Sequence, residues 1–311
     1  MADNDMWTIK AALDWTIGFL ERKGDENPRL SAEWLMSEAT GLSRIELYVN
    51  FERPLTLDER ATLRDFVARR GKGEPLQLIS GKVPFRYITV LVAPNVLIPR
   101  PETEVLVSEA FAELNLPRVA DHVAAGENGE EVVSPELPEL RVVDLCTGSG
   151  CIACSIASEY PAAHVVALDI APEALALAGK NVEVLGLGNR IEVLESDLLG
   201  ALDPGKKGTF DLIVSNPPYV PTKVCDSLPR EVSEWDSRLA LDGGEDGLDL
   251  FRRFLPDALS YLKPGGVLAV ELFEGHLEQA RNGACAAGFD QARIALDLTG
   301  RPRVLIARKP R

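Results

Sequence analysis

The chain has 311 residues, 46% of them hydrophobic, so it is long enough to bury a sizeable core and to form two domains. The formal net charge of −15, from 48 acidic and 33 basic residues, disfavours a protein that tracks along phosphate backbones and favours a partner with a basic surface. No apolar run reaches membrane-spanning length, and residues 1–5 are acidic, unlike a signal peptide, so we expect a cytoplasmic protein.

The cysteines do not form the pattern of a secreted disulfide framework, because there are five of them in a long chain: Cys146, Cys151, Cys154, Cys225 and Cys285. Cys151 and Cys154 have the spacing of a redox or metal-binding pair. They lie, however, in a run of small residues typical of a buried helix, and no second ligand pair follows. We therefore predict no metal site.

Residues 1–73 are predicted to form a small helical domain. Trp7, Ala11 and Trp15, continuing to residues 17–20, make an apolar stripe at helical spacing. Ser43 followed by Glu46, and Thr56 followed by Glu59, fit capping boxes. The segment contains no cluster of titratable groups in a catalytic pattern, so we interpret it as a packing or substrate-docking domain.

Residues 74–97 are predicted to link the domains, with residues 81–92 forming one strand of a β-hairpin. In residues 98–104, Arg100 and Glu102 either face a cleft or belong to an ordinary helix N-terminus with acidic first-turn residues; without further information the second interpretation is favoured. Residues 117–140 are acidic, contain Gly and Pro and show no periodicity, so they predict a mobile surface loop.

From residue 140 onward, predicted strands and helices alternate, as in an α/β doubly wound sheet. The strands are residues 140–145, 164–169, 191–194, 210–215 and 266–272, and the helices are residues 150–160, 172–185, 248–262 and 276–287. Residues 292–298 and 303–307 predict an antiparallel pair at the end. A terminal hairpin on a mostly parallel sheet is unlike a plain dinucleotide-binding domain.

The first strand of this sheet leads into a glycine-containing turn and then a helix, which is a common place for a cofactor. Gly148 and Gly150 allow close approach of a ligand to the backbone. About twenty residues later, Asp169 ends the next strand, where a carboxylate can accept both hydroxyls of a ribose. Asp197 and Leu198 end the third strand, where they can contact an adenine, although a cap and a core residue would look the same.

The nicotinamide cofactors remain an alternative, but their fingerprint requires glycine where this chain has Cys146 and Cys151. The three histidines are His122, His164 and His276, and none lies in an obvious hydride-transfer setting. We interpret all three as structural or solvent-exposed.

The stretch Asn216-Pro217-Pro218-Tyr219 follows the apolar run 210–214, so Asn216 is expected at the carboxyl end of a buried strand. Two prolines stiffen the loop and leave the carbonyls of Asn216 and Pro217 free to accept hydrogen bonds. Tyr219 adds a flat surface. Together they suit a planar group that carries an –NH2, although a proline-rich turn alone would be the commoner structure.

Together these residues resemble the class I S-adenosylmethionine-dependent methyltransferases, and more narrowly the protein-(glutamine-N5) methyltransferase family that modifies peptide chain release factors. The matching segments cover nearly the whole chain: residues 30–35, 47–55, 74–77 with Gly81 and Phe85, 98–104, 144–150, 216–219 and 239–248. The resemblance implies a mostly parallel seven-stranded sheet with a terminal antiparallel hairpin over residues 98–311, and S-adenosylmethionine as the cofactor. It also implies that the target is a glutamine of a Gly-Gly-Gln motif.

The resemblance also implies roles for individual residues. Cofactor contacts fall on Cys146, Thr147, Gly148, Ser149, Gly150, Asp169, Asp197, Leu198 and Asn216. Asn216 and Pro217 would accept the amide of the substrate, and Pro218 and Tyr219 would complete its pocket. Residues 100–104 are placed near the methionine end of the cofactor.

Three other functions are weighed against this one. The turn from Cys146 to Cys151 looks like that of sister enzymes that methylate a glutamine of a large-subunit ribosomal protein. Asn-Pro-Pro-Tyr is shared with DNA adenine-N6 methyltransferases, which need a basic groove and base flipping that this acidic chain does not suggest. A non-catalytic adapter would have little need of both Asp169 and the Asn216 motif. We expect a monomer that acts on release factors and does not bind nucleic acid stably.

Overall fold

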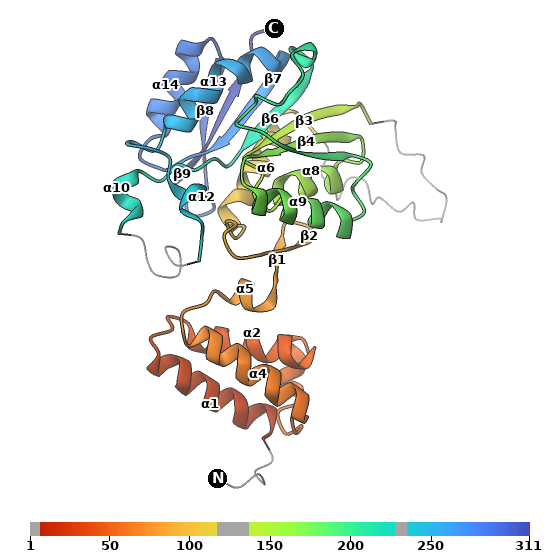
Figure 1. The fold of residues 1–311 in the computed structure, drawn as a ribbon, viewed down its shortest axis with the longest axis vertical. Helices are drawn as coiled ribbons and strands as arrows, with labels where there is room; N and C mark the ends of the chain where they lie inside the picture. Colours follow the sequence, from red (N-terminus) through yellow and green to blue (C-terminus); the bar gives the residue numbers. More distant parts are fainter. Residues whose placement is uncertain (1–6, 117–136, 228–234) are drawn as a thin grey trace. The chain divides into compact units, whose positions relative to one another are not determined.

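The computed structural model describes residues 7–116, 137–227 and 235–311 (Figure 1). These residues divide into two compact units. The first contains the described residues up to Lys82 together with Trp235, and the second contains the remaining described residues, including the sheet. The loop predicted over residues 117–140 lies mostly outside the described residues, since 117–136 are not among them. None of the helices in the described ranges is long and apolar enough to cross a membrane.

The first unit is helical, as predicted, and its helices are α1 (Ile9–Arg22), α2 (Pro28–Thr40), α3 (Arg44–Val49), α4 (Leu57–Arg70) and α5 (Leu76–Ser80). Both predicted capping boxes are confirmed: the hydroxyls of Ser43 and Thr56 accept from the backbone N–H three residues on, and the glutamates there accept in return. Helix α1 is present where the apolar stripe predicted a helix. Its buried residues are Ile9, Ala12, Leu13, Thr16 and Leu20.

Trp15, which belongs to the apolar stripe noted in the sequence, is 49% exposed. Its ring stacks on Phe19 and meets Trp7 edge to face. Helix α1 therefore carries two apolar stripes at helical spacing, and only packing against α2 and α4 decides which of them is buried.

A complete hairpin occupies the stretch that was predicted to be a single strand. It pairs β1 (Lys82–Phe85) with β2 (Ile88–Leu91) in a separate two-stranded sheet. The turn was missed because it contains no Gly, Asn or Pro. Arg86 adopts a left-handed backbone conformation (φ 51°), and its guanidinium donates two hydrogen bonds of 2.6 Å to Glu159. Tertiary contacts thus hold a turn that local sequence does not favour.

The second unit is built on a seven-stranded sheet with the order β5-β4-β3-β6-β7-β9-β8. Its strands are β3 (Leu140–Leu145), β4 (Ala163–Asp169), β5 (Ile191–Glu195), β6 (Phe210–Ser215), β7 (Leu262–Glu271), β8 (Asp290–Leu296) and β9 (Pro302–Arg308). The first five are parallel to one another, and β9 is antiparallel to β7 and β8, which confirms the predicted terminal hairpin. The chain order reverses between β3 and β6, so the sheet has a topological switch point there.

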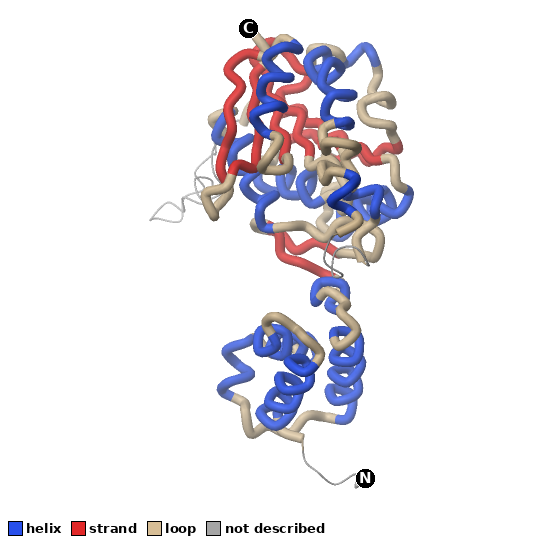
Figure 2. The backbone as a smooth tube through the Cα atoms, turned by 90° about the vertical axis from the view of Figure 1, so that its left-hand side faces the viewer, coloured by secondary structure: helices blue, strands red, loops and turns tan. Residues whose placement is uncertain are grey.

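Helices cover both faces of this sheet (Figure 2). The side chain of Asp144 accepts a hydrogen bond from α8, whereas its neighbours Val143 and Leu145 lie in one core cluster with Phe251 and Phe254 of α13. Because alternate residues of a strand point to opposite faces, α8 and α13 lie on opposite sides of β3. Helices α6 and α9 flank α8, and α14 flanks α13; the bounds are α6 (Pro101–Glu113), α8 (Cys151–Glu159), α9 (Pro172–Val184), α13 (Asp249–Tyr261) and α14 (Leu277–Ala287).

Most predicted elements of this unit are confirmed to within two residues, but β7 begins four residues earlier than predicted. Leu262 already pairs with Phe210, and the ladder is irregular after this pair. The sequence Pro264-Gly265-Gly266 does not look like a strand, so the early start of β7 was not predicted. Three short elements were not predicted: the 3₁₀ turn η1 (Pro204–Lys206), α10 (Thr222–Cys225) and α12 (Arg238–Leu241).

The buried ion pair between Arg86 and Glu159 yields a test of the hairpin. The two side chains are 12% and 3% exposed, so Glu159→Ala leaves a buried guanidinium without its carboxylate. We expect the free energy of unfolding of this unit to fall by about 3–5 kcal/mol in urea denaturation. The matched control is Glu139→Ala, which removes a carboxylate from the half-exposed pair with Arg141 and should leave the midpoint unchanged. Equal effects of the two substitutions would show that the buried pair does not hold the turn.

Candidate functional site

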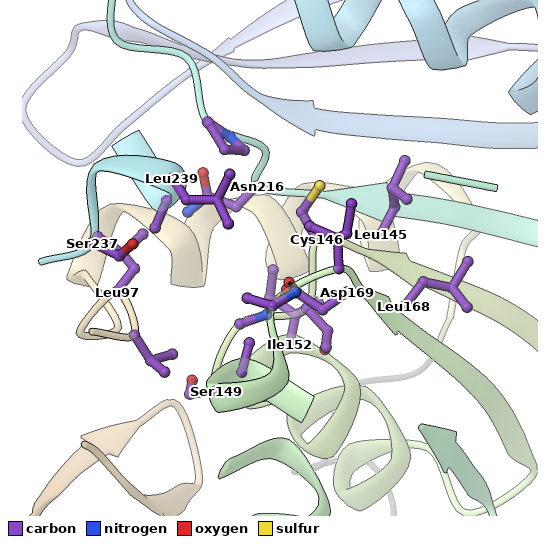
Figure 3. Close-up of a pocket in the computed structure, with 18 of the residues that line it drawn as sticks. Leu97, Leu145, Cys146, Ser149, Ile152, Leu168, Asp169, Asn216, Ser237 and Leu239 are labelled. Atoms are coloured by element: carbon purple, nitrogen blue, oxygen red, sulfur yellow. Dashed lines mark hydrogen bonds between the residues drawn. The ribbon is translucent and has the colours of Figure 1, made fainter. Parts of the chain in front are cut away.

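A pocket of about 200 Å³ lies at the carboxyl ends of β3, β4, β5 and β6 (Figure 3). This is the switch-point edge, where open parallel sheets bind ligands. Of the predicted site residues, the pocket is lined by Cys146, Thr147, Gly148, Ser149, Asp169, Asp197, Leu198, Asn216 and Pro218. Gly150, Pro217 and Tyr219 lie beside it and do not line it. The structure therefore brings together residues from four separate strand ends.

The turn between β3 and α8 is bonded directly to the end of β4. One carboxylate oxygen of Asp169 accepts from the Gly148 N–H at 2.8 Å, and the other accepts from the Ala171 N–H at 3.0 Å. The Thr147 N–H donates to the Leu168 carbonyl at 2.9 Å. Because each carboxylate oxygen has a second lone pair, Asp169 is held in place and can still accept from a ligand.

Gly150 has a structural reason for being glycine. It is the N-cap of α8 with φ 77°, and a Cβ there would lie 3.1 Å from the Cβ of Ala178. The requirement thus comes from close packing of α8 against α9. Gly148, with φ 55°, is the glycine of this turn that lines the pocket.

Asp144 lies beneath the same turn and is fully buried. Its Oδ2 accepts from the Thr147 hydroxyl at 2.6 Å and from the Ala153 N–H at 3.0 Å, while Oδ1 has no hydrogen-bond partner. Burial raises the pKa of Asp144 to about 7, and Asp169 adds to the increase through its negative charge. Strongly perturbed carboxyls of this kind gather at functional sites.

The end of β5 supplies one wall of the pocket. Leu198 adopts φ 52°, and its carbonyl accepts from the Ser196 hydroxyl at 2.6 Å. The Asp197 carboxylate accepts two hydrogen bonds from Arg253, at 2.8 and 3.0 Å, and both side chains are more than half exposed. Asp197 therefore lies at the rim of the pocket with an arginine that sequence reasoning did not assign.

The end of β6 carries Asn216. Its Nδ2 donates to the Thr103 hydroxyl at 3.1 Å, and its Oδ1 is buried without a hydrogen-bond partner. In Figure 3, Asn216 lies next to Leu239 in the upper part of the view, with Cys146 beside it on the right and Asp169 below. A buried carbonyl oxygen without a donor is costly, and a ligand with an N–H would satisfy it.

The Tyr219 side chain packs against the core, and its hydroxyl donates to Glu271 Oε1 at 3.1 Å. Burial, with the nearby charge of Glu271, raises the pKa of Tyr219, which therefore stays protonated. Thr103 donates to the other oxygen of Glu271 at 2.7 Å. The sequence alone assigns no individual role to Thr103 or Glu271, although Glu271 directly follows the apolar run 267–270 of β7, much as Asn216 follows the apolar strand β6.

The loop after Asn216 is held rigidly by residues 241–247. The Val220 N–H donates to the Leu241 carbonyl and the Val220 carbonyl accepts from Gly243, both at 2.9 Å. Gly247 has φ 74°, and a Cβ there would lie 2.2 Å from the Tyr219 carbonyl oxygen, so no other residue fits. Residues 241–247 therefore hold the Asn216 loop in place.

Arg100 and Thr103, from the segment 98–104, line the pocket. The same segment also forms the predicted N-terminus of α6. Arg100 donates to the buried Asp236 at 2.8 Å. Burial raises the pKa of Asp236, and the arginine charge opposes that increase. Glu104 instead accepts from the Arg86 N–H at 3.1 Å, away from the pocket.

Cys151 and Cys154 lie on α8, as predicted, and both are buried. Burial raises the pKa of the Cys154 thiol to about 12 and also raises that of Cys151. Within the described residues no group of three or more potential ligands is arranged to hold a metal ion.

Known proteins show similarity over nearly the whole chain. A family model described as the PrmC N-terminal domain matches residues 11–81, and one described as the methyltransferase small domain matches residues 128–229. A relative from Geobacter sulfurreducens, named release factor glutamine methyltransferase, is 45% identical over 301 residues, covering 97% of this chain and 96% of that protein. One of the same name from Rhodopirellula baltica is 39% identical over 308 residues, covering 97% of each.

Among solved structures, one described as the delta-N METTL16 MTase domain aligns with a TM-score of 0.51 at 17% sequence identity, covering 71% of this chain and 88% of that one. At that identity the likeness concerns the fold alone. The strand order, the terminal antiparallel hairpin and the pocket at the switch point define a class I methyltransferase. The relatives narrow the class, and the chain belongs to the release factor glutamine methyltransferase family, which confirms the resemblance.

The raised pKa of Asp144 predicts a pH dependence of stability. The native protein keeps this proton up to about pH 7, whereas the unfolded chain releases it near its ordinary pKa of 3.8. Between these values the unfolded state binds fewer protons, so stability falls as the pH rises. The control is Asp144→Asn. We expect the difference between the free energy of unfolding of the wild type and that of this variant to fall by up to roughly 4 kcal/mol from about pH 4 to pH 7. Urea denaturation at several pH values measures this, and parallel curves would disprove it.

Proposed function

We propose that this protein transfers a methyl group from S-adenosylmethionine to the side-chain amide nitrogen of a glutamine in a peptide chain release factor. The observation that carries the proposal is the buried Oδ1 of Asn216, which has no hydrogen-bond partner in a pocket wall at the end of β6. Membership of the family supplies the class of acceptor. An amide –NH2 is the planar donor that such an oxygen can accept from.

The pocket residues fit S-adenosylmethionine, which when bound supplies an electrophilic sulfonium methyl. Asp169 would accept the ribose hydroxyls, since both of its oxygens retain free lone pairs. Thr147, Gly148 and Ser149 would run along the ligand, with Cys146 at the start of the turn. Leu198 would pack on the adenine, and Asp197 at the rim would accept from its amine.

Catalysis in this proposal depends on position. The nitrogen of an amide is a poor nucleophile because its lone pair is delocalised into the carbonyl. If Asn216 Oδ1 and the Pro217 carbonyl each accept one N–H of the glutamine, they hold the nitrogen with its lone pair directed at the methyl. The same acceptors stabilise the positive charge that develops on it. Pro218 lines the pocket and Tyr219 lies beside it, and the proton is lost to water.

We also propose that the helical unit docks the partner, that the protein acts as a monomer in the cytoplasm, and that its surface favours a basic protein partner over nucleic acid. The net charge of −15 supports the last of these.

The first mutational test separates chemistry from cofactor binding. Asn216→Ala removes the acceptor of the substrate amide, so we expect turnover to fall by on the order of 10²- to 10³-fold or more while S-adenosylmethionine still binds. Asp169→Ala is the reciprocal variant and should weaken cofactor binding. Isothermal titration with the cofactor and single-turnover methyl transfer measure the two effects. Undiminished turnover in Asn216→Ala would refute the proposed mechanism.

The acceptor is tested with labelled methyl groups. We expect label from S-adenosylmethionine on the glutamine of a Gly-Gly-Gln motif in purified release factor, and none on ribosomal protein or duplex DNA, with Asn216→Ala as the inactive control. Peptide mass spectrometry locates the label. Label on ribosomal protein or DNA alone would be consistent with methyl transfer from S-adenosylmethionine but would refute release factor as the substrate.

A further inference from the structure

We infer that Thr103 and Glu271 are positioning residues that fix the orientation of the Asn216 side-chain amide, so that its carbonyl oxygen rather than its –NH2 faces the substrate. The inference rests on the proposed function. It extends that function to two residues in distant parts of the chain, neither of which is placed against the reacting atoms.

Three hydrogen bonds carry the inference. Asn216 Nδ2 donates to Thr103 Oγ1 at 3.1 Å, Thr103 Oγ1 donates to Glu271 Oε2 at 2.7 Å, and Tyr219 donates to Glu271 Oε1 at 3.1 Å. Thr103 lies in the first turn of α6, Glu271 ends β7, and both are nearly fully buried. The network therefore joins the two ends of the Asn216-Pro217-Pro218-Tyr219 motif through one carboxylate.

The direction of the hydrogen bonds follows from a count of hydrogens. Both oxygens of Glu271 accept, one from the Tyr219 hydroxyl and the other from the Thr103 hydroxyl, so the single hydroxyl hydrogen of Thr103 is used on Glu271. Thr103 Oγ1 then has only lone pairs left for Asn216, and it can face the –NH2 but not the carbonyl oxygen. Glu271 thus sets which end of the Asn216 amide is available in the pocket, and the unpartnered Oδ1 is the result.

The orientation matters because the two ends of this amide have opposite hydrogen-bonding character. With Oδ1 toward the substrate, Asn216 accepts an N–H of the glutamine. With the amide inverted, two N–H donors meet an N–H donor, and the reacting nitrogen is no longer held. Tyr219 holds the second oxygen of Glu271, so the carboxylate does not depend on Thr103 alone for its position.

Two substitutions at Thr103 separate orientation from packing. Thr103→Val keeps the volume and removes the hydroxyl, whereas Thr103→Ser keeps the hydroxyl and removes a buried methyl. Orientation predicts that kcat for methyl transfer falls on the order of ten- to a hundredfold in Thr103→Val, with the cofactor Kd unchanged, and is largely retained in Thr103→Ser. A packing role predicts the reverse ranking, because Thr103→Ser leaves a cavity.

Glu271→Gln is the second variant, since it places an –NH2 against one of the two hydroxyls and disturbs their directions. We expect kcat to fall in it as well, and Thr103→Val combined with Glu271→Gln to be little worse than either alone, because the residues act as one unit. Additive losses would overturn the inference. Thermal midpoints of all variants are measured alongside to identify any that fail to fold.

A measurement that does not need turnover keeps the inference separate from the proposed function. In spectra of ¹⁵N-labelled protein, the side-chain –NH2 of Asn216 should exchange slowly with solvent in the wild type and in Thr103→Ser, and at least tenfold faster in Thr103→Val. Equal exchange in all three would overturn the inference even in an active enzyme. Wild-type protein that methylates no acceptor but shows the expected exchange would refute the proposed function and keep the orientation of Asn216.

Discussion

The reversal of strand order between β3 and β6 is the constraint on which the rest of the molecule depends. Parallel strands present all their carboxyl ends at one edge, and the reversal separates the connections that leave β3 and β6, so a pocket opens between them. The Ser215 hydroxyl donates to the Leu145 carbonyl at 2.7 Å and fixes the two ends relative to one another. The turn at Gly148 and the amide of Asn216 are neighbours for this reason, although the two strand ends, at Leu145 and Ser215, lie 70 positions apart in the sequence.

Sequence patterns predict the strand ends of this pocket well, because hydrophobic runs fix where each parallel strand ends. The polar residue after each run, such as Asp169 or Asn216, could be assigned without the structure. The patterns fail where a tertiary contact overrides local preference. The Arg86 turn is held by Glu159, which lies 73 residues away, and the buried stripe of α1 is chosen by its neighbours rather than by its own periodicity.

Thr103 and Glu271 mark a second limit of sequence reasoning. They lie 168 residues apart, and each alone has an ordinary explanation: a first-turn threonine and a carboxylate at the end of a strand. Only the fold shows that α6 brings one to the other and that Asn216 completes the set. The placement of Glu271 at the end of β7, directly after the apolar run 267–270, was a usable signal, since Asn216 likewise follows the apolar residues of β6.

Asp144 and Glu271 have the same physical role on two sides of the pocket. Each is a buried carboxyl group, and burial raises the pKa of both. The protein is therefore less stable with either carboxyl group than it would be with an apolar residue in its place. Each also accepts from a threonine hydroxyl whose own position shapes the pocket wall, Thr147 in the turn after β3 and Thr103 in α6. A carboxyl oxygen that carries no hydrogen can only accept, so it imposes one direction on the hydroxyl it binds. The sheet thus gives up stability at two strand ends to provide its pocket walls with a defined pattern of donors and acceptors, which apolar packing cannot specify.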